Sequence, residues 1–250
     1  MELKNSQRKK INVNLPSINQ EAMQRSAISL LGCYEHLSIN KQHLLFPLLG
    51  NAAPKQWVHY PEDDVIDHST GYQYFYHSHS PEDRQDSPEH GHFHLFARMD
   101  GEKHDIDANT EARFLDSLKS APDRVSTNAN LLCISLDAKG VPMSMFTVNR
   151  WVTEDHLLSS STTLTLLNDF RVTTPGFETV NQWLEAMLGL FWTEIVGLLV
   201  QRDLRLAELV SSRSQTDSLL EDTTIEVLSD TAIDIDYKIS LLDQATESTN

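Results

Sequence analysis

The sequence predicts an α+β fold, in which an antiparallel sheet of two hairpins plus a short strand is packed by an N-terminal helix and a long C-terminal helix. Residues 72–98 and 130–155 contain alternating apolar and polar runs rich in β-branched and aromatic residues, as strands do. Apolar residues recur at helical spacing over residues 18–37 and 175–212. Helices that cover a sheet bury the apolar faces of both elements.

The helix over residues 18–37 begins at a capping box made by Ser17 and Gln20. A second short helical turn is expected over residues 41–49. The string WVHYP (57–61) predicts a short strand that ends at its proline.

Residues 72–98 form the first predicted hairpin and contain five of the chain's eleven histidines. Neighbouring side chains on a strand point to opposite faces, so the tyrosines of the first strand lie behind its histidines. A register that matches those tyrosines with Phe93 and Leu95 buries one apolar face, and a slip of one residue would exchange every side chain. In this register all five imidazoles project from one face. They are His77, His79, His90, His92 and His94.

The second predicted hairpin runs through residues 130–155 and turns at Lys139-Gly140. Its last strand includes Arg150 in the string NRWVT. A short helix near residues 110–118, capped by Asn109, precedes this hairpin. The long helix over 175–212 follows it, with Thr174 as N-cap and Pro175 at its first position.

Residues 17–213 are expected to form a single α+β domain, because 250 residues suit one large domain with tails. Residues 1–16 form an expected flexible basic arm. Residues 214–250 contain nine acidic residues and one lysine, which predicts an acidic, disordered tail. An alternation in residues 231–242 leaves a docked strand or a partner-binding motif as an alternative for part of this tail.

The formal net charge of −16 argues against nucleic-acid binding and against docking on an anionic membrane. Cys33 and Cys133 stand one hundred residues apart, which fits neither a disulfide framework nor a thiolate metal site. The N-terminal residues lack the apolar run of a secretory signal. Residues 183–200 are apolar, but Glu185 and Glu194 lie inside them, which favours a core helix over a membrane span. We therefore expect a soluble, cytoplasmic protein.

The predicted register places His77 across from His92, and His79 across from His90. Directly opposed residues have Cβ atoms about 4.5–5.5 Å apart, so two imidazoles can close on one ion with bonds of about 2.0–2.1 Å. Glu89 beside the second strand offers a carboxylate. Nitrogen and oxygen donors without thiolates suit a divalent metal, namely Fe, Zn, Cu or Ni.

Two ligand sets remain open at this point. Two histidines and one carboxylate would resemble a non-haem iron triad, and three histidines would resemble a catalytic zinc site. His59 on the preceding strand is expected to reach the same face as a substrate-binding residue. Arg150 is either an anchor for an anionic substrate or the partner of Glu154 or of an acid in residues 62–67. Tyr76 is either a pocket wall or a core aromatic.

Four strings of this chain resemble an uncharacterised bacterial family with a domain of unknown function. They are WxHYPxxDVxD (57–67), QYxYHxH (73–79), EHGHFHxF (89–96) and NRWVT (149–153). The resemblance spans roughly residues 20–210 and implies no activity and no catalytic residue. It implies that the histidine hairpin and the NRWVT strand belong to one domain.

No nucleotide-binding, nucleophile-elbow or HExxH motif is present, so the histidine cluster is the informative chemical feature. The sequence therefore predicts a protein with a histidine-rich metal site, acting as a metal-dependent oxygenase or hydrolase. The alternative is a metal-free binding or protein-interaction module with a polar, histidine-lined pocket, whose partner is a small molecule or a protein.

Overall fold

The computed structural model describes residues 20–50, 54–79, 88–120, 126–213 and 219–247. The predicted flexible arm, residues 1–16, lies outside the described residues, as does the predicted helix cap at Ser17.

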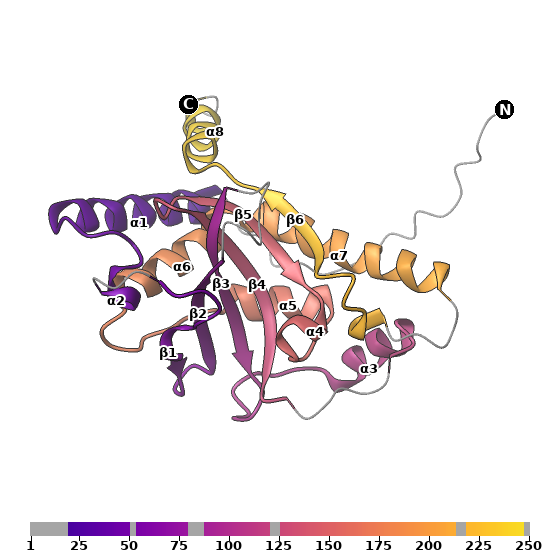
Figure 1. The fold of residues 1–250 in the computed structure, drawn as a ribbon. Coiled ribbons are helices and arrows are strands. Elements are labelled where there is room, and N and C mark those ends of the chain that lie inside the picture. Colours follow the sequence, from indigo (N-terminus) through magenta and orange to yellow (C-terminus); the bar gives the residue numbers. More distant parts are fainter. Residues whose placement is uncertain (1–19, 51–53, 80–87, 121–125, 214–218, 248–250) are drawn as a thin grey trace.

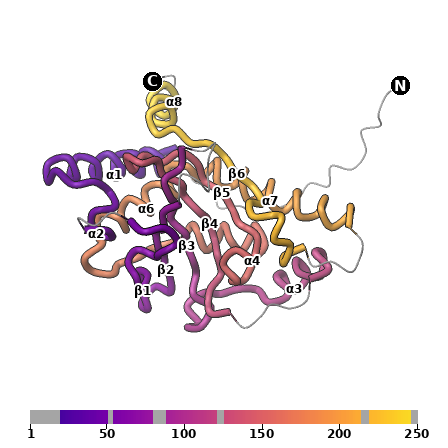
Figure 2. Tube along the Cα trace, in the orientation of Figure 1, coloured from indigo at the N-terminus to yellow at the C-terminus, as the bar shows by residue number. Residues whose placement is uncertain are grey.

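One antiparallel sheet organises the described chain, and its six strands lie side by side in the order in which they occur in the sequence (Figure 2). The α+β class is confirmed, but the sheet is larger than the two hairpins and short strand predicted. The first strand begins later and runs further than the predicted 57–61. The sixth strand lies at 227–232, earlier than the docked strand that residues 231–242 had left as an alternative, and most of 231–242 is helical. The strands are β1 (Tyr60–Asp67), β2 (Tyr72–Ser78), β3 (Glu89–Arg98), β4 (Asn128–Asp137), β5 (Pro142–Val148) and β6 (Val227–Ala232).

Helices cover the sheet and lie at its ends (Figure 1). The predicted N-terminal helix is present as α1, and α1 packs against α6. The helices in the described residues are α1 (Gln20–Ile39), α2 (Phe46–Leu49), α3 (Ala108–Ser117), α4 (Arg150–Thr153), α5 (Ser160–Asn168), α6 (Glu178–Leu190), α7 (Trp192–Ser212) and α8 (Ile235–Glu247), with a 3₁₀ turn, η1, at Leu219–Glu221.

The tyrosine face of the first hairpin packs into the main hydrophobic core with the helices. Tyr74 and Phe93 are fully buried, and the Phe93 ring lies 5.8 Å from that of Trp183 in α6. The Tyr74 hydroxyl donates to Asn181 Oδ1 at 2.7 Å, and the Tyr72 hydroxyl donates to the Leu166 carbonyl at 2.8 Å. The hydroxyls thus have acceptors inside the core, which removes the cost of burying them.

The predicted long C-terminal helix is two helices, because α6 and α7 meet at Phe191 with a bend of 73°. The bend lets α6 stay against α1 while α7 packs on β6. In the part of the chain that the structure describes, no single helix is long and apolar enough to cross a membrane. Only α6 and α7 taken together, as a bent pair, have the length and apolar composition of a span.

Three local predictions were wrong in detail. Thr174 and Pro175 do not start the long helix, because α6 begins at Glu178 with Phe177 as its N-cap. The NRWVT string does not continue a strand, because β5 ends at Val148 and α4 begins at Arg150, with the Asn149 side chain accepting from the Arg150 amide. The cap of α3 is Asp107, whose carboxylate accepts from the Asn109 amide, rather than Asn109 itself.

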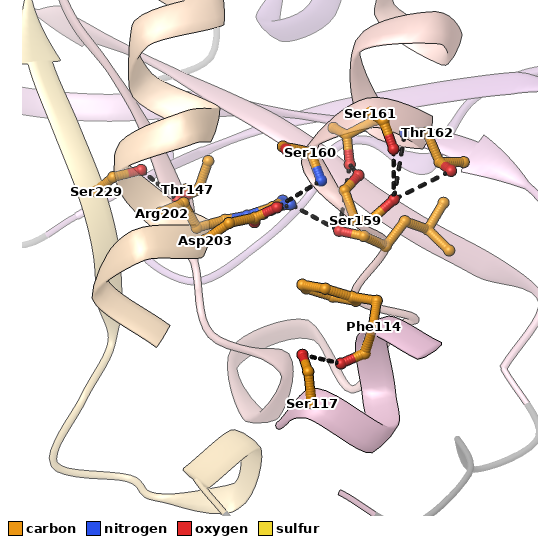
Figure 3. Close-up of polar contacts among 12 residues, drawn as sticks. Phe114, Ser117, Thr147, Ser159, Ser160, Ser161, Thr162, Arg202, Asp203 and Ser229 are labelled. Atoms are coloured by element: carbon orange, nitrogen blue, oxygen red, sulfur yellow. Dashed lines mark hydrogen bonds and ion pairs between the residues drawn. The ribbon is translucent and has the colours of Figure 1, made fainter. Parts of the chain in front are cut away.

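Residues 219–247 are ordered in η1, β6 and α8, which differs from the disordered tail that their acidity predicted. β6 pairs with β5 along its length, and the Thr147 and Ser229 hydroxyls lie 2.8 Å apart between the two strands (Figure 3). Asp230, the acidic residue of β6, fits an edge strand because its charge stays in solvent while the neighbouring Leu228 and Ser229 are buried. α8 projects beyond the sheet and contacts α1 (Figure 1).

A buried arginine fixes α7 to the start of α5 (Figure 3). Arg202 is 1% exposed, and its guanidinium donates to the Leu158 carbonyl at 2.7 Å and to Asp203 Oδ1 at 2.9 Å. The other carboxylate oxygen of Asp203 accepts from the Ser160 amide at 2.8 Å. The buried charge therefore has a carboxylate and a carbonyl as partners, as a charge in a core requires.

Gly91 of β3 has no room for a side chain, because a Cβ there would lie 2.5 Å from the Tyr76 hydroxyl and closer still to the His77 carbonyl. We expect Gly91→Ala to lower the free energy of unfolding by about 1–3 kcal/mol, since both β2 and the tyrosine must move. Gly197→Ala is the matched control, because its Cβ meets nothing within 4 Å in the interior of α7. The free energy of unfolding of Gly197→Ala should rise by about 0.5–1 kcal/mol, because alanine stabilises a helix interior relative to glycine. Chemical denaturation measures the free energy of unfolding of both variants. Equal effects at the two positions would contradict the close contacts described at Gly91.

Asp67 joins the β1–β2 turn to the segment before α6, because its carboxylate accepts from the Ser69, Thr70 and Thr173 amides. Burial opposes its ionisation, but hydrogen bonds from Ser69 and Thr173 outweigh burial and hold the pKa of Asp67 well below its usual value. The folded state therefore binds this proton less readily than the unfolded state, and stability is lost as the pH falls below about 4.

We expect Asp67→Asn to lower the free energy of unfolding at pH 7 by about 1–3 kcal/mol and to flatten its decline in acid. Denaturation curves between pH 7 and pH 3 measure both effects. Asp63→Asn, an exposed neighbour on β1, is the control. An unchanged acid slope in Asp67→Asn would show that other groups set the pH dependence.

Candidate metal centre

The predicted register of the histidine hairpin is confirmed. His77 pairs with His92, and the His79 amide donates to the His90 carbonyl at 2.9 Å. His77, His79 and His92 offer nitrogen atoms that all lie within 4.8 Å of one another, a group that could hold a metal ion. These three side chains come from β2, its C-terminal end and β3, on the face opposite the tyrosines.

The expectation that all five imidazoles share one face is wrong for His90. β3 has one extra residue there relative to β4, because Glu89 pairs with Asp137 and Gly91 pairs with Leu136. This β-bulge interrupts the alternation of side chains. The His90 ring turns to the tyrosine face, where its Nδ1 lies 2.8 Å from the Tyr76 hydroxyl. Glu89 in turn reaches the histidine face.

Three imidazole nitrogens converge at the centre of the cluster. His92 Nε2 lies 2.9 Å from His77 Nε2 and 2.9 Å from His94 Nε2. The His77 and His94 rings are 5.1 Å apart and nearly perpendicular. His92 therefore occupies the middle of the cluster, with one ring nitrogen facing both neighbours.

The other ring nitrogen of His92 faces a second group. Its Nδ1 lies 2.5 Å from Glu89 Oε1 and 3.3 Å from His79 Nε2. The His92 and Glu89 side chains are both nearly buried, at 3% and 9% exposed. A carboxylate at this distance accepts the Nδ1 proton and leaves the Nε2 lone pair directed at His77 and His94.

His94 is the most deeply placed of the cluster, with 1% of its surface exposed. Burial, together with the neighbouring His92 and His77, holds the pKa of His94 well below its usual value, so that its ring is neutral at pH 7. Its Nδ1 lies 3.1 Å from Asn130 Nδ2 and 3.2 Å from Cys133 Sγ.

A second β-bulge explains how Asn130 and Cys133 flank the same ring. The two residues differ by three positions and would face opposite sides of a regular strand. The pairing changes between Leu95↔Leu132 and Phe96↔Asn130, so β4 carries an extra residue and both side chains reach His94. Burial raises the pKa of Cys133 well above its usual value, which keeps it a thiol. Neither residue was predicted, because a bulge leaves no periodic signal.

A pocket of about 560 Å³ opens beside the cluster, and His77 and His94 form part of its wall. His59 reaches this face as predicted: its ring stacks on Phe75 at 3.6 Å, and its Nδ1 lies 2.9 Å from Asp64 Oδ1. Trp57 lies over the cluster, with its ring 4.9 Å from that of His79.

The two remaining candidate substrate-binding residues lie elsewhere. Tyr76 is fully buried on the tyrosine face, where it contacts His90 and Phe93. The Arg150 guanidinium pairs with Glu221 of η1 at 2.8 and 2.9 Å, a partner that was not predicted. Glu221 falls in the segment that was expected to be disordered, so the sequence could not suggest this partner.

The comparisons with known proteins place the chain in a family. A family model described as a domain of unknown function, DUF6969, matches residues 24–233. Neither the curated proteins nor the solved structures contain a match. The resemblance to a family with a domain of unknown function is thereby confirmed, and the match extends beyond residue 210 to include β6. Because the match covers most of its 250 residues, the chain belongs to the DUF6969 family.

Proposed function

We propose that the protein is a metal-dependent enzyme whose single divalent ion is held by the Nε2 atoms of His77, His92 and His94. The observation that carries this proposal is the pair of 2.9 Å separations between His92 Nε2 and the other two nitrogens. Two nitrogens that bind one ion at about 2.0–2.1 Å are about 2.9 Å apart when the angle at the ion is near 90°, and about 3.3–3.4 Å apart at the tetrahedral angle that zinc prefers. Each of these two separations would therefore widen by roughly 0.4–0.5 Å on binding zinc.

Glu89 supports the centre as the hydrogen-bond partner of His92 in this proposal. Two ligands at about 2.0–2.2 Å and a right angle would be about 2.9 Å apart, whereas Glu89 Oε1 lies 2.5 Å from His92 Nδ1. The shorter separation favours a hydrogen bond over two ligands on one ion, and it lies below even the about 2.7–2.9 Å of a charge-assisted N–H···O bond. A carboxylate that accepts the second nitrogen proton of a ligating histidine orients the ring and raises its basicity.

The pocket favours a catalytic role for the ion over a purely structural one. A catalytic site keeps a coordination position for water or substrate, and His77 and His94 border the pocket of about 560 Å³. Three neutral nitrogen ligands match a catalytic zinc site better than an iron site with two histidines and a carboxylate. We therefore favour a hydrolase, in which the ion lowers the pKa of a bound water, over an oxygenase.

A metal-free binding module is the second candidate, because the same contacts make a continuous hydrogen-bond chain. Asn130 donates to His94, the His94 Nε2 proton points at His92, and the His92 Nδ1 proton points at Glu89. The His94 ring is neutral, and the three separations of 3.1, 2.9 and 2.5 Å bring each donor into direct contact with its acceptor. Metal analysis separates the two candidates.

We expect the purified protein to contain one equivalent of metal, and His77→Ala, His92→Ala and His94→Ala each to lose it. His90→Ala should keep the metal, because its ring lies on the opposite face against Tyr76. Elemental analysis after growth with Fe, Zn, Cu and Ni measures the content, and circular dichroism confirms folding. His79→Ala should also keep the metal, since His79 faces the Nδ1 side of His92.

A wild-type protein that stays metal-free after this growth and binds no metal in titration would refute the metal centre and support the binding module. Loss of metal in His79→Ala with retention in His94→Ala would instead place the ion at the Nδ1 side of His92, with Glu89 as a ligand.

Glu89→Gln should keep the stoichiometry of the bound metal but weaken its affinity by about 10- to 100-fold, because Gln is a poorer acceptor for the His92 proton. Competition with a chromogenic chelator measures the affinity. Glu62→Gln is the control, since this substitution removes the same charge from an exposed position on β1. An unchanged affinity in Glu89→Gln would remove Glu89 from the centre.

A further inference from the structure

The pocket beside the histidine cluster is lined by acceptors and aromatic rings. Three carboxylates contribute to it, from Asp64, Asp155 and Glu226, and no lysine or arginine occurs among the described residues that form its wall. Its volume of about 560 Å³ is that of a small-molecule site. An anion here would meet like charges at close range, whereas a cation would meet opposite charges.

Two neighbouring side chains hold the Asp64 carboxylate in place. Its Oδ1 lies 2.9 Å from His59 Nδ1, and its Oδ2 accepts from the Gln73 amide at 2.7 Å. Arg98 donates to the carbonyl oxygen of Gln73 at 3.0 Å and so fixes which end of the amide faces Asp64. The Asp64 side chain is only 14% exposed, so little solvent screens its charge.

Asp155 lines the same pocket. The Ser126 hydroxyl donates to its Oδ1 at 2.9 Å. Burial raises the pKa of Asp155, and the charge of Asp64 adds to this effect. A positively charged group between the two carboxylates would relieve the repulsion and restore the ionised form.

An independent observation also indicates a donor-bearing ligand. Asn128 is part of the pocket wall, and its Oδ1, which is buried behind that wall, has no hydrogen-bond donor within reach among the described residues, so that a turn of the amide would present it to a ligand. A buried acceptor without a donor costs free energy that a bound N–H group would recover. Aromatic rings complete the wall, and rings of this kind attract ammonium and guanidinium groups. They are Trp57, Phe75, Phe96 and Trp151.

We propose that this pocket binds a small organic cation with N–H donors, namely a primary ammonium, amidinium or guanidinium compound, and rejects anions. The carboxylates of Asp64 and Asp155 pair with its charge, and the carbonyl of Asn128 accepts one of its protons. The inference rests on the proposed function in one respect only, which is that this cation would be the substrate of the metal centre.

Titration calorimetry with benzylamine, benzylguanidine, benzyl alcohol and benzoate tests the proposal on the full chain. We expect the two cations to bind at least about tenfold more tightly than the alcohol, and benzoate to bind more weakly than the alcohol. Asp64→Asn and Asp155→Asn should each weaken the cations by about tenfold and leave the alcohol unchanged. Asp63→Asn, the exposed neighbour of Asp64, should bind all four compounds as wild type does.

Cations that bind no better than benzyl alcohol, or that keep their affinity in both pocket variants, would overturn the inference. Repeating the titrations after chelation of metal separates it from the proposed function. A protein that takes up no metal yet prefers cations refutes only the metal centre. A protein that holds metal without preferring cations refutes only the cation site. Loss of metal from Asp64→Asn would assign that carboxylate to the ion and overturn its role here.

Discussion

The pairing of β2 with β3 in one register determines both faces of the sheet. Tyr76 pairs with Phe93 and His77 pairs with His92, so the same hydrogen-bond ladder fixes a hydrophobic face and a polar one. Burial of the aromatic face drives the pairing, since several large side chains are removed from water at once. The histidines thus come together without having to stabilise the hairpin themselves, and they are available for chemistry.

The polar face departs from regular geometry at two points, and both departures serve the cluster. The bulge at His90 exchanges that ring for the carboxylate of Glu89. The bulge in β4 brings Asn130 and Cys133 to either side of His94. In each case the extra residue places a polar group against a ring nitrogen of the cluster. Bulges near functional sites re-aim side chains in this way.

Much of this arrangement could be predicted from the sequence, because alternation and burial are local signals. The tyrosine pattern fixed the register of His77 against His92, and helical spacing identified α1. Three features could not be predicted. The bulges leave no periodic pattern in the sequence, and the break at Phe191 depends on how α6 and α7 pack. The acidic composition of residues 214–250 is that of a disordered segment, so it did not indicate a strand. β6 is ordered because β5 supplies its hydrogen bonds, a contact with a segment about eighty residues earlier.

α4, which forms one wall of the pocket, is attached to the rest of the protein through the segment that follows α7. The Asn149 amide donates to the Glu226 carbonyl at 2.8 Å, the Asn149 side chain to the Leu219 carbonyl at 3.0 Å, and the Trp151 indole to the Ile225 carbonyl at 2.8 Å. A chain shortened to residue 213 would lose all these acceptors together with the sheet edge. The smallest unit able to carry the complete site therefore extends through β6. The family match ends at residue 233, directly after β6, and α8 lies outside both.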